Sequence, residues 1–423
     1  MSAPELVVKA SQVMRAERER LQTAADRVRT DPTPGVVLGD LVASGSGDVE
    51  LETIRSKVNA GERITPQEGL WLLTEAPLIA LAELANVWRF RHNPDPRVTF
   101  VADTNPNYTN FCDADCLFCA FYRKPGDEEE GYAYSIEELM GVIGRSVDLG
   151  ATTVLLQGGL HDEIPFEYYL DVIREFKRRF PDVHPHLYSA PEIGKMREVS
   201  GLSYDDIFIA LREAGLRTMP GGGAELLSDR VRMRLSPKKQ SCREWIEIHK
   251  AAHRQGLHTT ATMMYGHAEQ PADIVEHLEC LRRVQDEASG KSDGSGAGQV
   301  PSGAGFTAFI PWSYKPSNTP FEGKFPDEVG PSVYLRVLAV SRIYLDNIQH
   351  IQSSWFSEGK KAGQVALHFG TDDFGGTLIE ENVLAEAAHH VKTTTEETVQ
   401  LIRESGFTPA RRGTPLYDVV ETY

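Results

Sequence analysis

The order of hydrophobic and polar positions divides the chain into a helical beginning and a longer part of alternating character. Residues 1–95 carry apolar side chains at helical spacing, for example in GLWLLTEAPLIALAELANVWRFRH. From residue 96 onward, short β-branched runs alternate with amphipathic helical stretches. This alternation is typical of βα units around a parallel sheet. We therefore expect a helical segment at 1–95, followed by an α/β domain.

Eight runs of strand character occur between residues 96 and 375, and eight is the strand number of a (β/α)8 barrel. They are RVTFVADTN, ATTVLLQGG, VHPHLYSAP, LRTMPGGGAE, HTTATMMYGH, FTAFIPWSY, HIQSSWFSEG and ALHFGTDDFGG. Most of them end in small, polar or charged residues, and barrel enzymes build their sites at the carboxyl ends of the strands. We predict a TIM-type barrel over 96–375 and a C-terminal helical cap over 376–423.

Composition narrows the classes of partner. A Gly/Ser-rich stretch at 287–305 has almost no apolar anchor and is interpreted as a flexible insertion on the barrel. The formal net charge of -17 disfavours nucleic-acid and anionic-membrane partners, because these require clustered Lys and Arg. No stretch resembles a spanning helix, and the start of the chain lacks the apolar core of a signal peptide. We expect a cytoplasmic protein that acts on a small molecule.

The main candidate for chemistry is the loop after the first predicted strand, DTNPNYTNFCDADCLFCAFYRK. In it, Cys112, Cys116 and Cys119 have the spacing C-x3-C-x2-C. Three thiolates can ligate three irons of a cubane cluster and leave the fourth iron open, whereas ferredoxin-type clusters and structural zinc sites use four protein ligands. A structural zinc site remains the alternative. It is disfavoured because no histidine lies between this loop and the end of the next predicted strand.

The loop resembles the C-x3-C-x-aromatic-C signature of the radical S-adenosylmethionine (SAM) superfamily, with Phe118 at the aromatic position. The resemblance implies a [4Fe-4S] cluster on the three cysteines, SAM bound at the open iron, and Phe118 beside the adenine ring. It also implies reductive cleavage of SAM to a 5'-deoxyadenosyl radical, with an electron donor such as flavodoxin or ferredoxin. A non-enzymatic iron-sulfur sensor is the alternative of a different class, and the predicted barrel favours an enzyme.

Candidate cofactor-binding residues follow the second, third and fifth predicted strands, at the expected site end of the barrel. They are Gln157, Gly158, Gly159, Ser189, Glu192 and Thr262. A glycine pair lets a ligand approach the backbone, and in the radical SAM family the corresponding strand end meets the amino group of SAM. Glu192 is a candidate acceptor for ribose hydroxyls, and Thr262 suits an adenosyl group. A tight turn, a solvated loop residue and core packing are the plainer interpretations of these positions.

Candidate substrate-binding residues follow the fourth and sixth predicted strands. Glu225 comes after three consecutive glycines in PGGGAE, while Trp312 and Asn318 lie in PWSYKPSNTP. An aromatic platform beside polar groups suits a large aromatic substrate, although Trp312 is equally consistent with core filling. His267 and Glu225 are also candidates for a catalytic proton carrier, and for His267 a hydrogen bond at the rim fits better.

Further segments extend the resemblance to one family within the superfamily. NYTN, CAFYR, LLQGGL, PGGGAE, ATMMYGH, FIPWSYKPSNTP and IQSSW resemble the dehypoxanthine futalosine cyclases of the futalosine route to menaquinone. The resemblance implies hydrogen abstraction at C4' of the substrate ribose, followed by attack of the sugar radical on the benzoate ring. Aminofutalosine synthases and deazaflavin-forming synthase subunits are similar in the cluster loop, QGGL and GGGAE, and remain alternatives. The Gly/Ser insertion departs from the family pattern.

Overall fold

The computed structural model describes residues 49–423 except 128, 291–302 and 327–328. The first helices in this part of the chain are α3 (Leu51–Ala60), α4 (Pro66–Thr74) and α5 (Leu78–His92). The helical character predicted for this segment is confirmed where the structure describes it. Helices α4 and α5 pack on α13 (Pro331–Tyr344), and their apolar side chains belong to the same hydrophobic core as the barrel.

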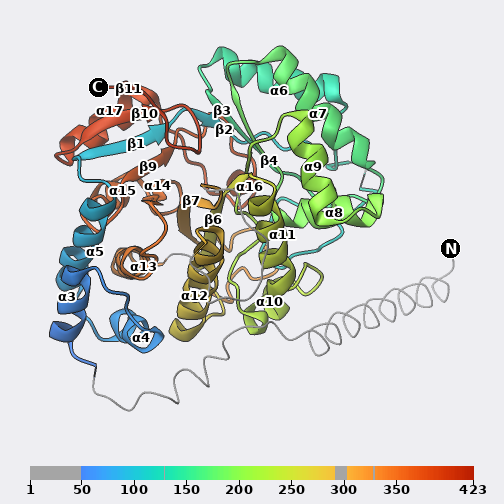
Figure 1. Cartoon of the computed structure of the whole chain (residues 1–423). Helices are drawn as coiled ribbons and strands as arrows, with labels where there is room; N and C mark the ends of the chain where they lie inside the picture. Colours follow the sequence, from blue (N-terminus) through green and yellow to red (C-terminus); the bar gives the residue numbers. More distant parts are fainter. Residues whose placement is uncertain (1–48, 128, 291–302, 327–328) are drawn as a thin grey trace.

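A curled sheet of seven strands forms the centre of the molecule, and all neighbouring strands in it are parallel (Figure 1). Its order is β2 (Asp103–Thr104), β3 (Thr153–Leu156), β4 (His184–Leu187), β5 (Thr218–Met219), β6 (His258–Tyr265), β7 (Phe306–Ser313) and β8 (His350–Ile351). The helices that connect these strands, besides α13, are α6 (Ile136–Asp148), α7 (Phe166–Arg179), α8 (Ala190–Ser200), α9 (Tyr204–Ala214), α10 (Asp229–Leu235), α11 (Cys242–Arg254) and α12 (Pro271–Ala288). The predicted α/β barrel class is confirmed.

A smaller sheet adjoins the barrel, with the order β11 (Val419–Thr422), β10 (Thr408–Arg412), β1 (Arg97–Val101) and β9 (Asp373–Gly376). The first predicted strand contributes to both sheets, because its beginning forms β1 and its end forms β2. After β8 come α14 (Trp355–Glu358) and α15 (Lys360–Ala366). The last predicted strand run begins at the end of α15, and only its final residues form β9. A parallel bridge between Gln352 and Asp373 and the pairing of β1 with β9 continue the ring beyond β8.

The structure therefore corrects the expected single eight-stranded sheet to two sheets, one of seven strands and one of four. The C-terminal segment is also not purely helical, because α16 (Val383–Glu386) and α17 (Thr395–Glu404) are followed by β10 and β11. The physical reason is the buried strand β1, whose free edge takes β10 as a parallel neighbour. Arg412 at the end of β10 is buried and donates from Nε to Asp373 Oδ2 on β9 at 2.7 Å.

Most of the predicted Gly/Ser insertion lies outside the described residues, so its interpretation stays a prediction. Helix α12 extends to Ala288, just inside the start of that stretch. Among the described residues, no helix is both long enough and apolar enough to cross a membrane.

Candidate functional site

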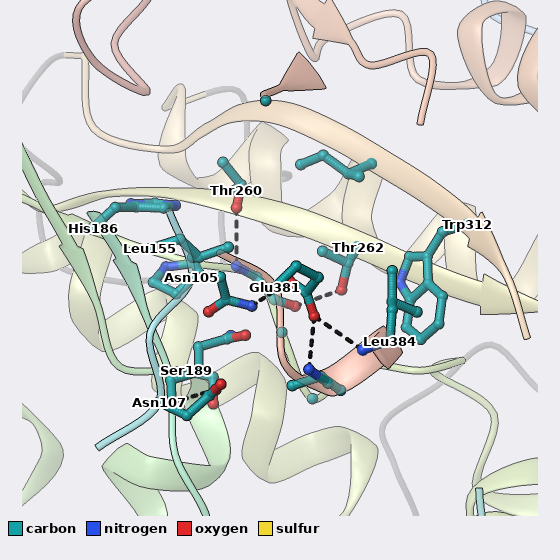
Figure 2. Close-up of a pocket in the computed structure, with 18 of the residues that line it drawn as sticks. Asn105, Asn107, Leu155, His186, Ser189, Thr260, Thr262, Trp312, Glu381 and Leu384 are labelled. Atoms are coloured by element: carbon teal, nitrogen blue, oxygen red, sulfur yellow. Dashed lines mark hydrogen bonds between the residues drawn. The ribbon is translucent and has the colours of Figure 1, made fainter. Parts of the chain in front are cut away.

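A cavity of about 380 Å³ lies inside the curled sheet and brings most of the predicted site residues together. The predicted residues that line it are Cys112, Cys116, Phe118, Cys119, Gln157, Gly158, Gly159, Ser189, Glu225, Thr262 and Trp312. They come from the loops after β2, β3, β4 and β5 and from strands β6 and β7. Figure 2 shows part of this wall, with Thr262 and Trp312 from two neighbouring strands. Polar strand ends from across the sequence thus converge on one site, as the barrel prediction requires.

Backbone contacts hold the cysteine loop against the end of β3. The amide of Gly159 donates to Thr109 O at 3.0 Å, and the amide of Asp113 donates to Leu160 O at 3.0 Å. A Cβ atom at Gly159 would lie 2.0 Å from Phe111 O, and one at Gly158 would lie 2.5 Å from the Tyr108 ring. The glycine pair is therefore required for close packing of the cysteine loop on the strand. Its role exceeds that of a tight turn.

The three cysteines of the loop are free thiols that share one cavity. Burial raises the pKa of each thiol, and the nearby Lys239 ammonium opposes that rise. Iron supplies the positive charge that makes thiolates stable at such a site. Within the ranges that the structure describes, no three His, Cys, Asp or Glu side chains are arranged to hold a single metal ion. Three free thiols that share one loop and one cavity fit a cluster in which each binds a different iron, because such ligands need not converge on one point.

Lys239 is a cavity residue that the sequence analysis missed. Its Nζ donates to Glu225 Oε1 at 2.7 Å and lies 5.5 Å from the centre of the Phe118 ring. The other carboxylate oxygen of Glu225 accepts from Arg232 Nη1 at 3.3 Å. Glu225 thus binds two cations and places one of them beside the cysteine loop. Lys239 lies in the polar segment SPKKQ after α10, which carries no motif that distinguishes it from a solvated turn.

Glu192 does not line the cavity, in contrast to the expected contact with ribose. Its Oε1 accepts from Tyr108 Oη at 2.8 Å and from Gly158 N at 3.1 Å. Its Oε2 accepts from Ser189 N and from Ser189 Oγ, both at 2.6 Å. Burial raises the pKa of Glu192 to about 7, against the lowering effect of these hydrogen bonds. With four donors already bound, Glu192 ties the ends of β3 and β4 to the segment before the cysteines.

Thr262 and Trp312 face the cavity as expected. The Thr262 hydroxyl donates to Gly221 O at 2.8 Å, and the Gly221 amide donates to Thr260 Oγ1 at 2.9 Å. A Cβ atom at Gly221 would lie 2.3 Å from Thr260 O, so the first of the three glycines is required for this close approach. The two threonines thereby hold the glycine loop after β5 against β6. Trp312 is half-buried and contributes an aromatic surface.

Asn318 and His267 lie outside the cavity lining, in contrast to their predicted roles. Asn318 is exposed, adopts a φ of 59°, and donates from Nδ2 to Glu386 O at 2.8 Å. The ring of His267 contacts Met264 O at 2.9 Å and lies 2.8 Å from Glu269 Oε2. The side chain of Asn318 thus joins the loop after β7 to the end of α16, whereas His267 contacts only residues near it in the chain.

Several other cavity residues were missed. Asp103, Asn105 and Asn107 lie in the same segment as the predicted cysteine loop but were not singled out, whereas the others lie in segments predicted to be structural: His186, Glu381, Arg412 and Tyr417. Glu381, Arg412 and Tyr417 belong to the C-terminal part of the chain, which sequence reasoning treated as a cap. The asparagines were visible in NPNYTN before the cysteines, but nothing in that string indicates which of them faces inward.

Two protein-family models match neighbouring parts of this chain. The model of the radical SAM superfamily matches residues 106–281, and the model of the CofH/MqnC C-terminal region matches residues 303–422. The cyclic dehypoxanthine futalosine synthase of Halalkalibacterium halodurans is 38% identical over 89% of this chain and 96% of its own. The chain belongs to the radical SAM superfamily. It is therefore an enzyme, and its cofactors are the predicted [4Fe-4S] cluster and SAM.

Other relatives carry different names. A 5-amino-6-(D-ribitylamino)uracil–L-tyrosine 4-hydroxyphenyl transferase of Methanopyrus kandleri is 42% identical over 77% of this chain and 85% of its own. An aminodeoxyfutalosine synthase of Thermus thermophilus is 35% identical, over 87% and 95% respectively. Family membership is thus shared by enzymes with at least three names. The C-terminal match also includes the residues of β10 and β11.

Solved structures agree with the fold. Methylornithine synthase has a TM-score of 0.61 at 17% identity and covers 85% of this chain and 98% of its own. The FeFe-hydrogenase maturase HydG of Carboxydothermus hydrogenoformans has a TM-score of 0.64 at 16% identity, with coverage of 92% and 83%. At these identities the likeness concerns the fold alone.

Proposed function

We propose that this enzyme converts dehypoxanthine futalosine to cyclic dehypoxanthine futalosine, a step of the futalosine route to menaquinone. The main support is the identity of 38% and 37% with the cyclic dehypoxanthine futalosine synthases of Halalkalibacterium halodurans and Streptomyces coelicolor, over 96% and 88% of their lengths. A second candidate is the tyrosine-using transferase reaction. It is favoured by the 42% identity with the Methanopyrus kandleri protein over a shorter part of the chain.

The residues that line the cavity suggest how the cofactors would be held. Cys112, Cys116 and Cys119 would hold the cluster, and Phe118 and the end of β3 would flank SAM. When bound, these cofactors supply the 5'-deoxyadenosyl radical that removes a hydrogen atom from the substrate.

The substrate end of the cavity offers an aromatic and a polar surface. Trp312 on β7 lies beside Met264 on β6 in the sheet register and presents its ring to the cavity. An aromatic side chain of this kind orients a benzoate ring by offset or edge contacts. Holding that ring near the ribose favours closure between the two parts of one molecule, because the reacting groups need no further search.

The test uses dehypoxanthine futalosine that carries deuterium at C4'. The enzyme is reconstituted with iron and sulfide without oxygen, then mixed with SAM and dithionite. We expect a spiro-cyclised product, one 5'-deoxyadenosine per turnover, and deuterium in that 5'-deoxyadenosine. Parallel reactions contain tyrosine with 5-amino-6-(D-ribitylamino)uracil, or the enol-ether substrate of aminofutalosine synthases. Turnover in one of these reactions, without label transfer from C4', would assign the protein to a sibling activity.

The remaining partners belong to the same proposal. A flavodoxin or ferredoxin would supply the electron, a cytoplasmic location would provide the reducing conditions that free thiols require, and neither nucleic acid nor membrane would take part. Replacing dithionite by a reduced flavodoxin in the assay above measures the first of these points directly.

A further inference from the structure

Two polar side chains from distant parts of the chain meet on the cavity wall. Asn105 follows β2, and Glu381 lies between β9 and α16. The Asn105 Nδ2 donates to Glu381 Oε2 at 2.7 Å, and a parallel bridge joins the two backbones. Figure 2 shows the two side chains facing each other in the cavity.

Asn105 has an oxygen atom without a hydrogen-bond partner. The residue is 5% exposed, and its Oδ1 is buried and unpartnered among the described residues. Nδ2 faces Glu381, as a hydrogen bond to a carboxylate requires, so Oδ1 is the atom left without a partner. A buried carbonyl oxygen without a donor is costly. A ligand that donates a hydrogen bond would remove this cost.

Glu381 adds a second acceptor next to the first. Its Oε1 accepts from the amides of Val383 and Leu384 at 2.9 and 3.0 Å, and its Oε2 accepts only the hydrogen bond from Asn105 among the contacts that the structure gives. An ionised carboxylate has about four acceptor positions, so Oε2 retains one. The pair Asn105–Glu381 therefore presents two neighbouring acceptors to the cavity.

The surrounding charges select the kind of ligand that fits these acceptors. Asp103 lines the same cavity and interacts electrostatically with Glu381. Of the cationic side chains in the described lining, Arg412 is bound to Asp373 on the adjacent sheet and Lys239 is bound to Glu225. This region of the wall repels an anionic group and favours donors without negative charge. Two hydroxyls on adjacent carbon atoms match two neighbouring acceptors.

We propose that Asn105 and Glu381 bind the vicinal hydroxyl groups of a ribose in this cavity. The ribose belongs either to SAM or to the sugar-bearing substrate, and the substrate assignment rests on the proposed function. Both residues act by positioning: they hold the sugar so that its carbon atoms have one orientation relative to the cluster loop. Neither residue exchanges a proton or electron with it.

The test measures binding to the cluster-loaded enzyme without reductant, so that no turnover occurs. Wild type, Asn105→Ala and Glu381→Gln are titrated with SAM alone, and then with dehypoxanthine futalosine and with 5-amino-6-(D-ribitylamino)uracil in the presence of SAM. We expect the Kd of one sugar-bearing ligand to rise about 10-fold to 100-fold in both variants. A higher Kd for SAM alone would show that the pair binds the ribose of SAM. A higher Kd for dehypoxanthine futalosine or for 5-amino-6-(D-ribitylamino)uracil, with unchanged SAM binding, would show that the pair binds the sugar part of the substrate.

The matched control is Asn86→Ala on α5. Asn86 also has a buried, unpartnered Oδ1, and its Nδ2 donates to His368 O at 2.8 Å, away from the cavity lining. This variant should bind every ligand like wild type. Iron content and circular dichroism establish that each variant is folded, and Glu381→Gln keeps the side-chain size if Asn105→Ala proves unstable. Unchanged Kd values for all three ligands in a folded variant would overturn the inference. Failure of wild type to bind dehypoxanthine futalosine would reject only the proposed function.

Discussion

The chemistry of the site depends on three thiols whose burial disfavours their ionised form. Cys112, Cys116 and Cys119 lie in the cavity with the ammonium of Lys239 nearby. The other two cysteines are placed differently: Cys242 begins α11 and is buried, and Cys280 lies within α12. Only the first group shares a loop and a cavity, so only that group is suited to hold iron.

Replacing any one cysteine of the loop by Ala should abolish the visible absorbance of the cluster together with SAM cleavage. The reason is that each thiolate binds one iron, and no other cysteine lines the cavity in the described part of the chain. Cys242→Ala and Cys280→Ala should retain both properties. Iron and sulfide analysis with a 5'-deoxyadenosine assay measures this directly. Loss of iron from either control variant would refute the three-ligand assignment.

The cysteine loop and strand β3 act together at the scale of elements, because glycines allow their backbones to approach. Neither Gly158 nor Gly159 has a positive φ, so the absence of a side chain, and not an unusual conformation, explains them. Glu192 strengthens the same junction from the start of α8 through its bonds to Tyr108 and Gly158. The geometry of the loop is thus determined by its neighbours.

Gly159→Ala should lower iron loading and destabilise the protein by about 1–3 kcal/mol, as overpacking does. The added Cβ would lie 2.0 Å from Phe111 O and 3.0 Å from Cys112 Cβ. The backbone of Phe111 cannot move away from this Cβ without displacing Cys112, the next residue in the chain. Gly194→Ala within α8 is the control, since its Cβ meets nothing within 4 Å. That variant should be neutral or more stable by up to ~1 kcal/mol. Iron content and the thermal midpoint decide; equal behaviour of both variants would contradict the packing argument.

Buried histidines affect the stability of the whole molecule. Burial lowers the pKa of His249 and His277 to about 3, and that of His92 and His184 to about 4. Below about pH 6.5 the unfolded chain binds protons at these histidines, whereas the folded state does not. The contribution of the buried histidines to the free energy of unfolding is therefore complete above that pH and is lost as the pH falls. Burial also lowers the pKa of His186, His253 and His258. Four carboxyls oppose the trend because burial raises their pKa. They are Glu192 and Glu276, to about 7, Asp103, to about 6, and Glu381.

The histidines outnumber these carboxyls, so the free energy of unfolding should fall between pH 6.5 and pH 5. His249 stacks on Trp245 with ring centres 3.6 Å apart, which makes His249→Phe a conservative probe. This variant should lose about 1 kcal/mol less per pH unit than wild type in that range. Exposed His390→Gln should follow wild type. Denaturant unfolding under anaerobic conditions at several pH values supplies the slopes, and parallel slopes for wild type and His249→Phe would reject the assignment.

The sequence by itself determined the features that depend on neighbours along the chain. Alternating strand and helix patterns predicted the barrel class, and the spacing of three cysteines predicted the cluster. The start of α6 is likewise determined by neighbouring residues, which form the Ser135–Glu138 capping box. These signals are local, because hydrogen bonds within a turn and ligands on one loop need only adjacent residues.

The tertiary structure alone decided the features that join distant segments. Asn105 and Glu381 are 276 positions apart, yet their side chains share a hydrogen bond. Strand β10 of the C-terminal segment pairs with β1, and a hydrogen bond to Glu225 holds Lys239 beside the cysteine loop. The choice among these pairings depends on which apolar surfaces are buried together and which polar groups then lack a partner. That balance is a property of the folded chain, and no short stretch of sequence contains it.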